Sequence, residues 1–170
     1  MKFFKFITLL GFFLGLAACV ETSDIRPASK LVPPPDNPKV RQLLNLINEE
    51  RTKRNLRPLS SDPKLTKAAK LHAKEQMAEN HLDHKSLNGD SVSDRVSQAG
   101  YSWSFVAENL AAGRETASET VIDWINSLGH NKNLFTKSAT EFGAAYVSRP
   151  RIDQNDLGHF WVLVLAAPLN

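Results

Sequence analysis

The sequence predicts an α+β domain, because segments with helical periodicity come first and two strand-like runs follow near the end. Apolar residues recur on one helical face in four segments, which are residues 40–54, 63–77, 92–99 and 116–128. The strand-like runs are Phe142–Ser148 and Phe160–Ala166. We therefore expect helices to cover a sheet whose final strands pair antiparallel.

The first two helices are predicted from apolar spacing and start signals. After Pro38, Val40 and Ile47 fall on one face of a helix that ends near Arg54. Asp62 and Pro63 supply a cap followed by proline at the first helical position. One side of the second helix carries small and apolar residues together with two polar ones, namely Leu65, Ala68, Ala69, His72, Ala73, Gln76 and Met77.

Glycines are predicted to end the next two helices. A short helix stops at Gly100, since glycine commonly terminates helices. In the fourth, Thr116 and Glu119 form a capping-box pattern, and we expect it to end at Gly129. Its predicted buried face consists of Ala117, Val121, Trp124, Ile125 and Leu128.

The final strand-like run barely alternates between apolar and polar residues, which predicts burial on both faces. The loop before it contains the turn-forming residues Pro150, Asp153 and Gly158. A weaker strand pattern spans Phe105–Leu110. The domain from residue 38 to residue 170 is long enough to bury one core without disulfides or metal.

The N-terminus has the pattern of a bacterial export signal. Two lysines precede an apolar run, Phe6–Leu16, which leads to Ala17-Ala18-Cys19. That run is shorter than the roughly 20 apolar residues that span a bilayer. Cys19 is the only cysteine, so an internal disulfide is excluded. Leu-Ala-Ala-Cys resembles the lipobox of bacterial lipoproteins and implies a lipid on Cys19; the alternative is an ordinary secretory signal beside an incidental cysteine.

After a signal peptide spanning residues 1–18, residues 19–37 are predicted to form a lipidated, proline-rich tether, with Pro33-Pro34-Pro35 favouring an extended spacer. Removal of the signal takes away two lysines and no acidic residue, so the formal net charge falls from +3 to +1. Without a cluster of basic and aromatic residues, nucleic acid is not an expected partner. The expected location is the cell envelope. In enteric-type sorting, an aspartate directly after the lipidated cysteine often marks retention in the inner membrane. Val20 stands at that position here, which favours the outer membrane if the host has two membranes.

Several short patterns occur in an order that resembles the CAP superfamily of cysteine-rich secretory, antigen 5 and pathogenesis-related proteins, in its bacterial, disulfide-free branch. The resemblance covers about residues 40 to 167 and implies a three-layer α-β-α sandwich with a mainly antiparallel central sheet. It rests on Asp62-Pro63-Lys64-Leu65, His84, Arg95 with Gly100-Tyr101, Ala107-Glu108-Asn109-Leu110, Trp124 with Ser127, Gly129-His130, Asn133-Leu134-Phe135, Glu141-Phe142-Gly143 and Phe160-Trp161.

In many members of this superfamily, two histidines and two glutamates face a cleft and hold a divalent metal. The resemblance assigns the metal-ligand and candidate catalytic positions to His84, Glu108 and His130, with zinc as the expected cofactor. Ser127 stands where many members have the second glutamate, so the acid set is incomplete. We assign Asn109 a scaffold role and Glu141 a place near the cleft.

The remaining histidines and the tryptophans have simpler interpretations. His72 lies on the inner face of a helix, as a hydrogen-bonded core histidine would. We expect His81 to be structural or exposed and His159 to lie at a surface or edge. Core packing accounts for Trp103, Trp124 and Trp161. Without a nucleophile elbow around any serine, a serine hydrolase is not expected.

Two functions are consistent with these residues. The first is a binding module at the envelope that recognises a lipid, glycan or protein ligand through the cleft. The second is a metal-assisted hydrolase, in which an ion on His84 and His130 activates water and Glu108 moves the proton. The incomplete acid set favours the binding module.

Overall fold

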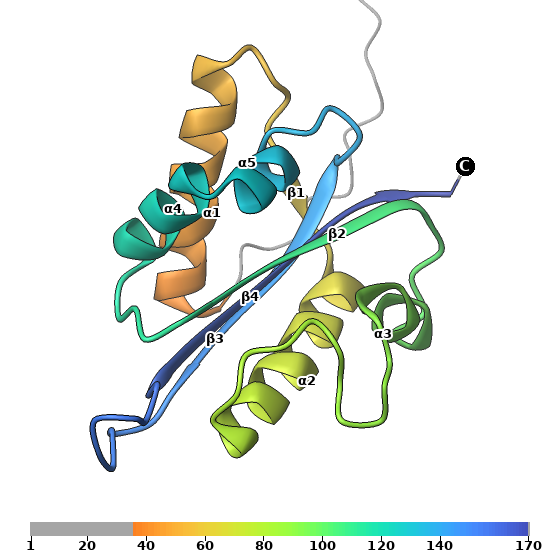
Figure 1. Ribbon diagram of the computed structural model, residues 1–170. Coiled ribbons are helices and arrows are strands. Elements are labelled where there is room, and N and C mark those ends of the chain that lie inside the picture. Colours follow the sequence, from red (N-terminus) through yellow and green to blue (C-terminus); the bar gives the residue numbers. More distant parts are fainter. Residues whose placement is uncertain (1–35, 170) are drawn as a thin grey trace, which may run out of the picture. The chain divides into compact units, whose positions relative to one another are not determined.

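A four-stranded sheet forms the middle layer of the domain, in the order β1-β3-β4-β2. The computed structural model describes residues 36–169, and the sheet lies between two helical layers (Figure 1). The strands are β1 (Ser60–Ser61), β2 (Trp103–Ala112), β3 (Glu141–Ser148) and β4 (His159–Pro168). The α+β, three-layer prediction is therefore confirmed.

The sheet is mixed rather than mainly antiparallel. β4 pairs antiparallel with both β2 and β3, as predicted for the last two strands. The two-residue strand β1 pairs parallel with β3, through Ser60 beside Glu141 and Ser61 beside Phe142. Two serines carry no apolar alternation, which explains why the sequence did not indicate this strand.

The helices divide between the two faces of the sheet (Figure 1). One layer contains α1 (Pro38–Lys53), α4 (Ala117–Asn126) and α5 (Leu128–Leu134). The other contains α2 (Pro63–Glu79) and α3 (Val92–Gln98). None of the helices within residues 36–169 is long and apolar enough to cross a membrane.

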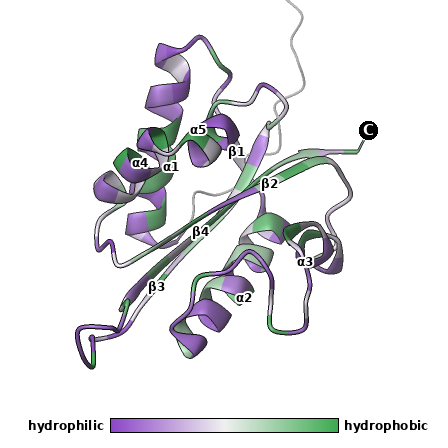
Figure 2. Cartoon of the chain, viewed as in Figure 1, coloured by the Kyte–Doolittle hydropathy of each residue, from purple (hydrophilic) through white to green (hydrophobic). Residues whose placement is uncertain are grey.

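Each helical layer buries its own apolar cluster against the sheet. Trp124, Trp161 and Phe142 belong to the cluster beneath α1 and α4. Leu65 and Val164 belong to the cluster beneath α2 and α3. Apolar colour accordingly concentrates on the sheet and on the inward faces of the helices in Figure 2, while the outward faces are largely hydrophilic. β4 is buried over most of its length, as its continuous apolar run predicted.

Helix α2 makes a close backbone approach to the sheet at Gly143. A Cβ atom built on Gly143 would lie 2.1 Å from the carbonyl carbon of Leu65 and 2.2 Å from the backbone nitrogen of Thr66. No side chain fits between these two backbones. Gly143 therefore sets the distance between α2 and β3, and with it the position of the layer that carries the α2–α3 loop.

The predicted start signals are present in the structure. Asp62 caps α2 by accepting from the backbone nitrogens of Lys64 and Leu65, with Pro63 in the first turn. Thr116 and Glu119 form the reciprocal capping box at the start of α4. These side chains satisfy backbone donors that a helix leaves unpaired at its first turn.

The predicted end of the fourth helix at Gly129 is wrong. α4 ends at Asn126, Ser127 is extended, and a separate helix α5 begins at Leu128. The side-chain amide of Asn131 donates to the carbonyl of Ile125 over 2.7 Å and so satisfies an acceptor at the end of α4. Leu128, predicted to be buried, is 93% exposed because the chain changes direction before it.

Two tryptophans are core residues as predicted, but Trp103 is not. Trp124 and Trp161 are 1% and 0% exposed, whereas Trp103 is 37% exposed at the start of the edge strand β2. Its ring nitrogen donates to the hydroxyl of Ser97 over 3.0 Å. The predicted signal peptide, Cys19 and nearly all of the tether lie outside the described residues.

Candidate functional site

Two adjacent residues of the edge strand β2 point to opposite faces of the sheet. Side chains alternate along a strand, so Glu108 lies on the side of Val106 and Leu110, beneath α2 and α3. Asn109 lies on the opposite side and contacts α5. Both are buried, with 5% of Glu108 and none of Asn109 exposed. The Glu-Asn pair therefore connects the two layers at one sheet edge.

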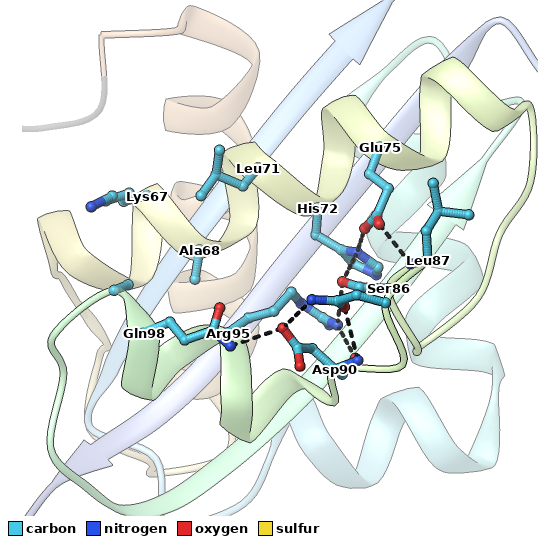
Figure 3. A pocket seen from close by; sticks show the side chains of 12 residues that line it. Lys67, Ala68, Leu71, His72, Glu75, Ser86, Leu87, Asp90, Arg95 and Gln98 are labelled. Atoms are coloured by element: carbon cyan, nitrogen blue, oxygen red, sulfur yellow. Dashed lines mark hydrogen bonds and ion pairs between the residues drawn. The ribbon is translucent and has the colours of Figure 1, made fainter.

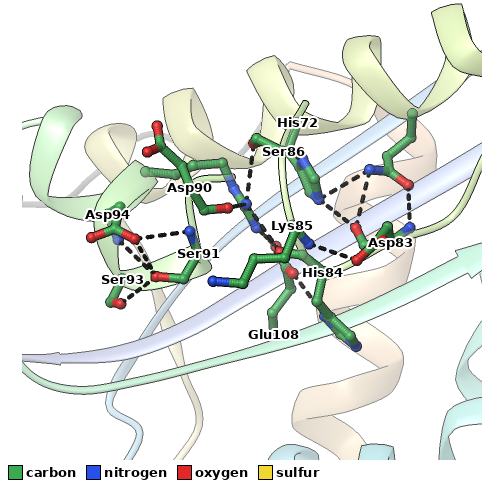
Figure 4. A network of polar contacts seen from close by, with 12 residues as sticks. His72, Asp83, His84, Lys85, Ser86, Asp90, Ser91, Ser93, Asp94 and Glu108 are labelled. Carbon is green, nitrogen blue, oxygen red and sulfur yellow. Dashed lines mark hydrogen bonds and ion pairs between the residues drawn. The ribbon is translucent and has the colours of Figure 1, made fainter. Parts of the chain in front are cut away.

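Glu108 uses both carboxylate oxygens for contacts within the protein (Figure 4). His84 donates from Nδ1 to Oε1 of Glu108 over 2.9 Å. Arg95 donates from Nη2 to Oε2 over 2.7 Å. Only 1% of the Glu108 side chain is exposed, whereas 61% of the His84 side chain is. A buried carboxylate thus holds an exposed imidazole in a fixed orientation.

Arg95 also fixes the loop that carries His84. Its Nη1 donates to the carbonyl oxygens of His84 and Asp90, over 3.1 and 2.9 Å, and to the hydroxyl of Ser86 over 3.2 Å. Arg95 occupies the inner side of α3, next to the buried Val96. In the sequence, Arg95 contributed only to the family resemblance. Its place three residues after Val92 was the available signal that it faces inward.

Helix α2 holds the other end of this loop. His72 is buried, with Nδ1 3.0 Å from a carboxylate oxygen of Glu75 and Nε2 2.9 Å from the carbonyl oxygen of Asp83. Gln76 accepts from the backbone nitrogen of Asp83 over 2.7 Å. His72 is therefore a hydrogen-bonded core histidine, as its place on the inner helix face predicted. The loop between α2 and α3 is held from both helices.

His130, which follows the predicted end of the fourth helix at Gly129, lies within helix α5 on the other side of β2. Asn109 donates to the carbonyl oxygen of His130 over 3.1 Å, which fixes α5 against the strand. Asn133 donates to the side-chain oxygen of Asn109 over 2.9 Å and to the carbonyl of Glu108 over 3.2 Å. This is the scaffold role expected of Asn109.

The two predicted cleft histidines have pKa values shifted in opposite directions. The hydrogen bond to Glu108 is the main cause that raises the pKa of His84 above its usual value. Burial is the main cause that lowers the pKa of His130, and the charge of His84 lowers it further. The two residues come from opposite layers, His84 from the α2–α3 loop and His130 from α5. The His130 ring lies against Trp124, with ring centroids 6.4 Å apart.

Glu141 and Ser127 do not complete an acid pair around these histidines. Glu141 accepts a hydrogen bond from the hydroxyl of Tyr101 and lies on β3, which β4 separates from β2. That hydrogen bond adds to burial in raising the pKa of Tyr101. Ser127 occupies the junction between α4 and α5.

The predicted metal ligands fit a metal ion only in part. Within residues 36–169, no group of three or more His, Cys, Asp or Glu side chains is arranged to hold one. Glu108 already accepts two hydrogen bonds, so its geometry is that of a residue orienting His84. A carboxylate bound to the second ring nitrogen of a histidine is a common arrangement behind metal-ligating imidazoles. The residues present therefore supply two imidazoles, and no third ligand accompanies them in the described part of the chain.

The structure contains a pocket that the sequence did not predict. It has a volume of about 550 Å³ and lies between α2, the α2–α3 loop and α3 (Figure 3). His72 and Arg95 line it, but His84, Glu108 and His130 do not. Its lining comes from three segments that only the fold brings together, so no local sequence pattern marks it.

Comparison with known sequences identifies the family. The sequence profile of the cysteine-rich secretory protein family (CAP) matches residues 44–165. The uncharacterized protein YkwD of Bacillus subtilis (strain 168) is 36% identical over 107 residues, which are 63% of this chain and 42% of that protein. The chain thus spans less than half of the length of this relative.

Comparison with solved structures gives the same fold. An outer surface protein of Borrelia burgdorferi matches with a TM-score of 0.70 and 25% identity, over 77% of this chain and 93% of that one. An extracellular protein containing an SCP domain from Bacillus anthracis str. Ames matches with a TM-score of 0.65 and 23% identity, over 78% and 44% of the two chains. Because the profile match covers most of the chain and the fold agrees, this chain belongs to the cysteine-rich secretory protein family.

Proposed function

We propose that this chain is a binding module of the cell envelope that recognises a lipid, glycan or protein ligand at the β2 edge, through His84 and His130. The observation that carries the proposal is the double engagement of Glu108 by His84 and Arg95. The side chain of Glu108 is only 1% exposed and each of its oxygens already accepts an internal hydrogen bond, so Glu108 orients its neighbours and has almost no access to a water molecule that it could activate. The geometry therefore favours binding over hydrolysis.

The proposed site presents a hydrogen-bond donor to its ligand. Glu108 holds Nδ1 of His84, so Nε2 is the ring nitrogen left for the exposed side. Because the pKa of His84 is raised, its ring keeps both protons to a higher pH than an ordinary histidine. The ligand chemistry that suits this donor is an acceptor oxygen of a hydroxyl, carboxylate or phosphate group.

A location in the envelope is supported by the family comparisons. The Borrelia protein is an outer surface protein and the Bacillus anthracis protein is extracellular. The proposed lipid on Cys19 would hold the domain at a membrane, with residues 20–37 as the spacer. In a host with two membranes, the outer membrane remains the proposed site.

Mass spectrometry of organic and aqueous extracts of the purified full chain tests the binding function. We expect a compound that co-purifies with the parent and is lost from His84→Gln. The matched control is His81→Gln, which removes an exposed histidine from the same loop without touching Glu108. Equal amounts of every co-purifying compound in the parent and His84→Gln would contradict a ligand site at His84.

A weak divalent metal site at the same edge is a second proposal, supported by the Glu108–His84 hydrogen bond. His84 and His130 would be the ligands, and a bound zinc ion would supply Lewis acidity there. Calorimetric zinc titration should show weak binding in the parent and none in His84→Ala or His130→Ala, with His81→Ala as the control. Equal binding by the parent and both variants would remove the site. Zinc-dependent cleavage of a casein substrate that is lost in His130→Ala would instead favour the hydrolase.

A further inference from the structure

The outward face of α2 carries four exposed lysines, Lys64, Lys67, Lys70 and Lys74, which we call the lysine face. Their spacing of three, three and four residues keeps them on one side of the helix. No ion pair or side-chain hydrogen bond engages any of the four within residues 36–169. The lysine face is therefore a positive surface without an internal partner.

Acidic residues near the lysine face have other partners. The carboxylate of Glu75 lies against His72 and accepts from the backbone nitrogen of Leu87 over 2.7 Å. Asp90 accepts from the side-chain amides of Asn88 and Gln98, each over 2.8 Å. The protein thus uses these two carboxylates to hold the neighbouring loop, and within residues 36–169 neither forms an ion pair with the four lysines.

Two exposed leucines accompany the lysines. Leu71 lies on α2 one turn after Lys67 and is 59% exposed, and Leu87 of the α2–α3 loop is 73% exposed. Both leucines and Lys67 line the pocket of about 550 Å³ (Figure 3). Transferring apolar side chains out of water is favourable, so two exposed leucines beside one pocket would gain from an apolar partner. This surface therefore combines unpaired positive charge with unburied apolar side chains.

We propose that the lysine face, together with Leu71 and Leu87, docks on the surface of an anionic lipid bilayer. Lysines gain from the negative potential of anionic headgroups, and apolar side chains between them gain by entering the headgroup–acyl boundary. A soluble polyanion would satisfy the lysines but would leave both leucines in water. The proposal does not use His84, Glu108 or His130 and does not rest on the proposed function.

Vesicle sedimentation with the full chain carrying Cys19→Ser tests the charge contribution. The vesicles contain phosphatidylcholine alone or phosphatidylcholine with phosphatidylglycerol, so that hydrophobic binding by the N-terminal segment, which needs no anionic headgroup, appears in both. Each lysine near an anionic surface raises partitioning about fivefold. We therefore expect Lys70→Gln/Lys74→Gln to lower partitioning to the anionic vesicles by about thirtyfold. Rising salt should weaken the partitioning of the parent to the same vesicles.

The matched control is Lys132→Gln/Lys137→Gln, which removes two exposed lysines from α5 and the segment after it, on the other side of the sheet. This variant should keep the parent's partitioning to anionic vesicles. Equal losses in the two variants would show a general effect of net charge and would overturn the proposal. Equal partitioning of the parent to neutral and anionic vesicles would overturn it as well.

The leucines distinguish a bilayer from a soluble polyanion. Leu71→Ser should reduce partitioning to anionic vesicles several-fold even at high salt, where headgroup attraction is screened. Ile122→Ser, which changes a 53% exposed residue on α4, is the matched control and should have no effect. If Leu71→Ser matched the parent on vesicles while soluble polyphosphate bound the parent and not Lys70→Gln/Lys74→Gln, the surface would be a polyanion site and the bilayer proposal would be overturned.

Discussion

Arg95 and Glu108 form a buried ion pair, and the guanidinium of Arg95 also donates hydrogen bonds to the α2–α3 loop. Nη2 of Arg95 lies 2.7 Å from Oε2 of Glu108, and their side chains are 8% and 1% exposed. Removing one member of such a pair leaves the other charge buried without a partner, which is strongly destabilising. The stability of the domain and the orientation of His84 therefore depend on the same contact.

Arg95→Met should lower the free energy of unfolding by about 3–5 kcal/mol, because Glu108 would be left as an unpaired buried charge. Urea denaturation measures the change. Arg54→Met is the control, since Arg54 pairs with Glu50 at the surface and should matter little. The double variant Arg95→Met/Glu108→Leu should recover part of the loss. If Arg95→Met had the same free energy of unfolding as the parent, that result would contradict the burial of the pair.

Trp124→Ala should lower the free energy of unfolding by about 3–5 kcal/mol, because it removes a buried aromatic side chain from the core. Trp124 also donates from its ring nitrogen to the carbonyl of Leu110 over 2.9 Å, a contact that alanine cannot make. Trp103→Ala is the matched control and should cost clearly less, since Trp103 is 37% exposed. Thermal or urea unfolding compares the two, and equal losses would be inconsistent with the burial difference.

His84 should titrate above 6.5 and His130 below it, as seen in the ring resonances of an NMR pH titration. Glu108 favours the cationic form of His84, whereas burial disfavours the cationic form of His130. Glu108→Gln should lower the pKa of His84, while the pKa of His130 should stay below its usual value. The reverse order of the two histidines would contradict the geometry of the site.

The same shift gives a sign to the pH dependence of stability. The pKa of His84 is higher in the folded than in the unfolded chain, so its contribution is fully present below 6.5 and is lost as pH rises through the folded value. The free energy of unfolding of the parent should therefore fall as the pH rises above 6.5. His84→Gln should not show this part of the fall. Urea denaturation at several pH values measures it, and identical profiles for the two proteins would refute the linkage.

Gly143→Ala should destabilise the domain by about 1–3 kcal/mol or more, because the new methyl group would overlap the backbone of α2. Gly129→Ala is the matched control, since nothing lies within 4 Å of the place that its new methyl group would take in α5. That change should stabilise the helix by about 0.5–1 kcal/mol. Melting temperatures that move in the same direction for both variants would contradict the close approach at Gly143.

Cys19→Ser should release the protein from the membrane fraction if a lipid on Cys19 anchors it. Fractionation of cells that express the parent and the variant provides the measurement. Unchanged retention in the membrane fraction would argue against the lipid. Because the lysine face would still contact anionic lipids, the wash should contain high salt, which screens that attraction.

Helical periodicity and capping residues predicted most of the fold. Asp62 and Thr116 marked helix starts correctly because their contacts span only two or three residues. The break at Ser127 was missed because the apolar spacing continues through Leu128, whereas the extended backbone of Ser127 and the contact of Asn131 with Ile125 are features of the folded chain. β1 was missed because its pairing with β3 joins segments far apart in the sequence.

The candidate site was predicted in part. Family resemblance selected His84, Glu108 and His130, and the structure brings His84 into contact with Glu108. Arg95 was not predicted as a partner, because its contacts to Glu108 and the loop depend on how α3 packs. The pocket beside Leu71 and the lysine face also needed the structure, since the loop that carries Leu87 folds back on α2.

The alternation of Glu108 and Asn109 along β2 makes this strand sensitive to changes in length. Inserting or deleting one residue before Glu108 would exchange the two side chains between faces. An amide would then face Arg95, and a carboxylate would enter the layer where Asn133 now donates to Asn109. β2 should therefore keep its residue count wherever both partnerships are retained.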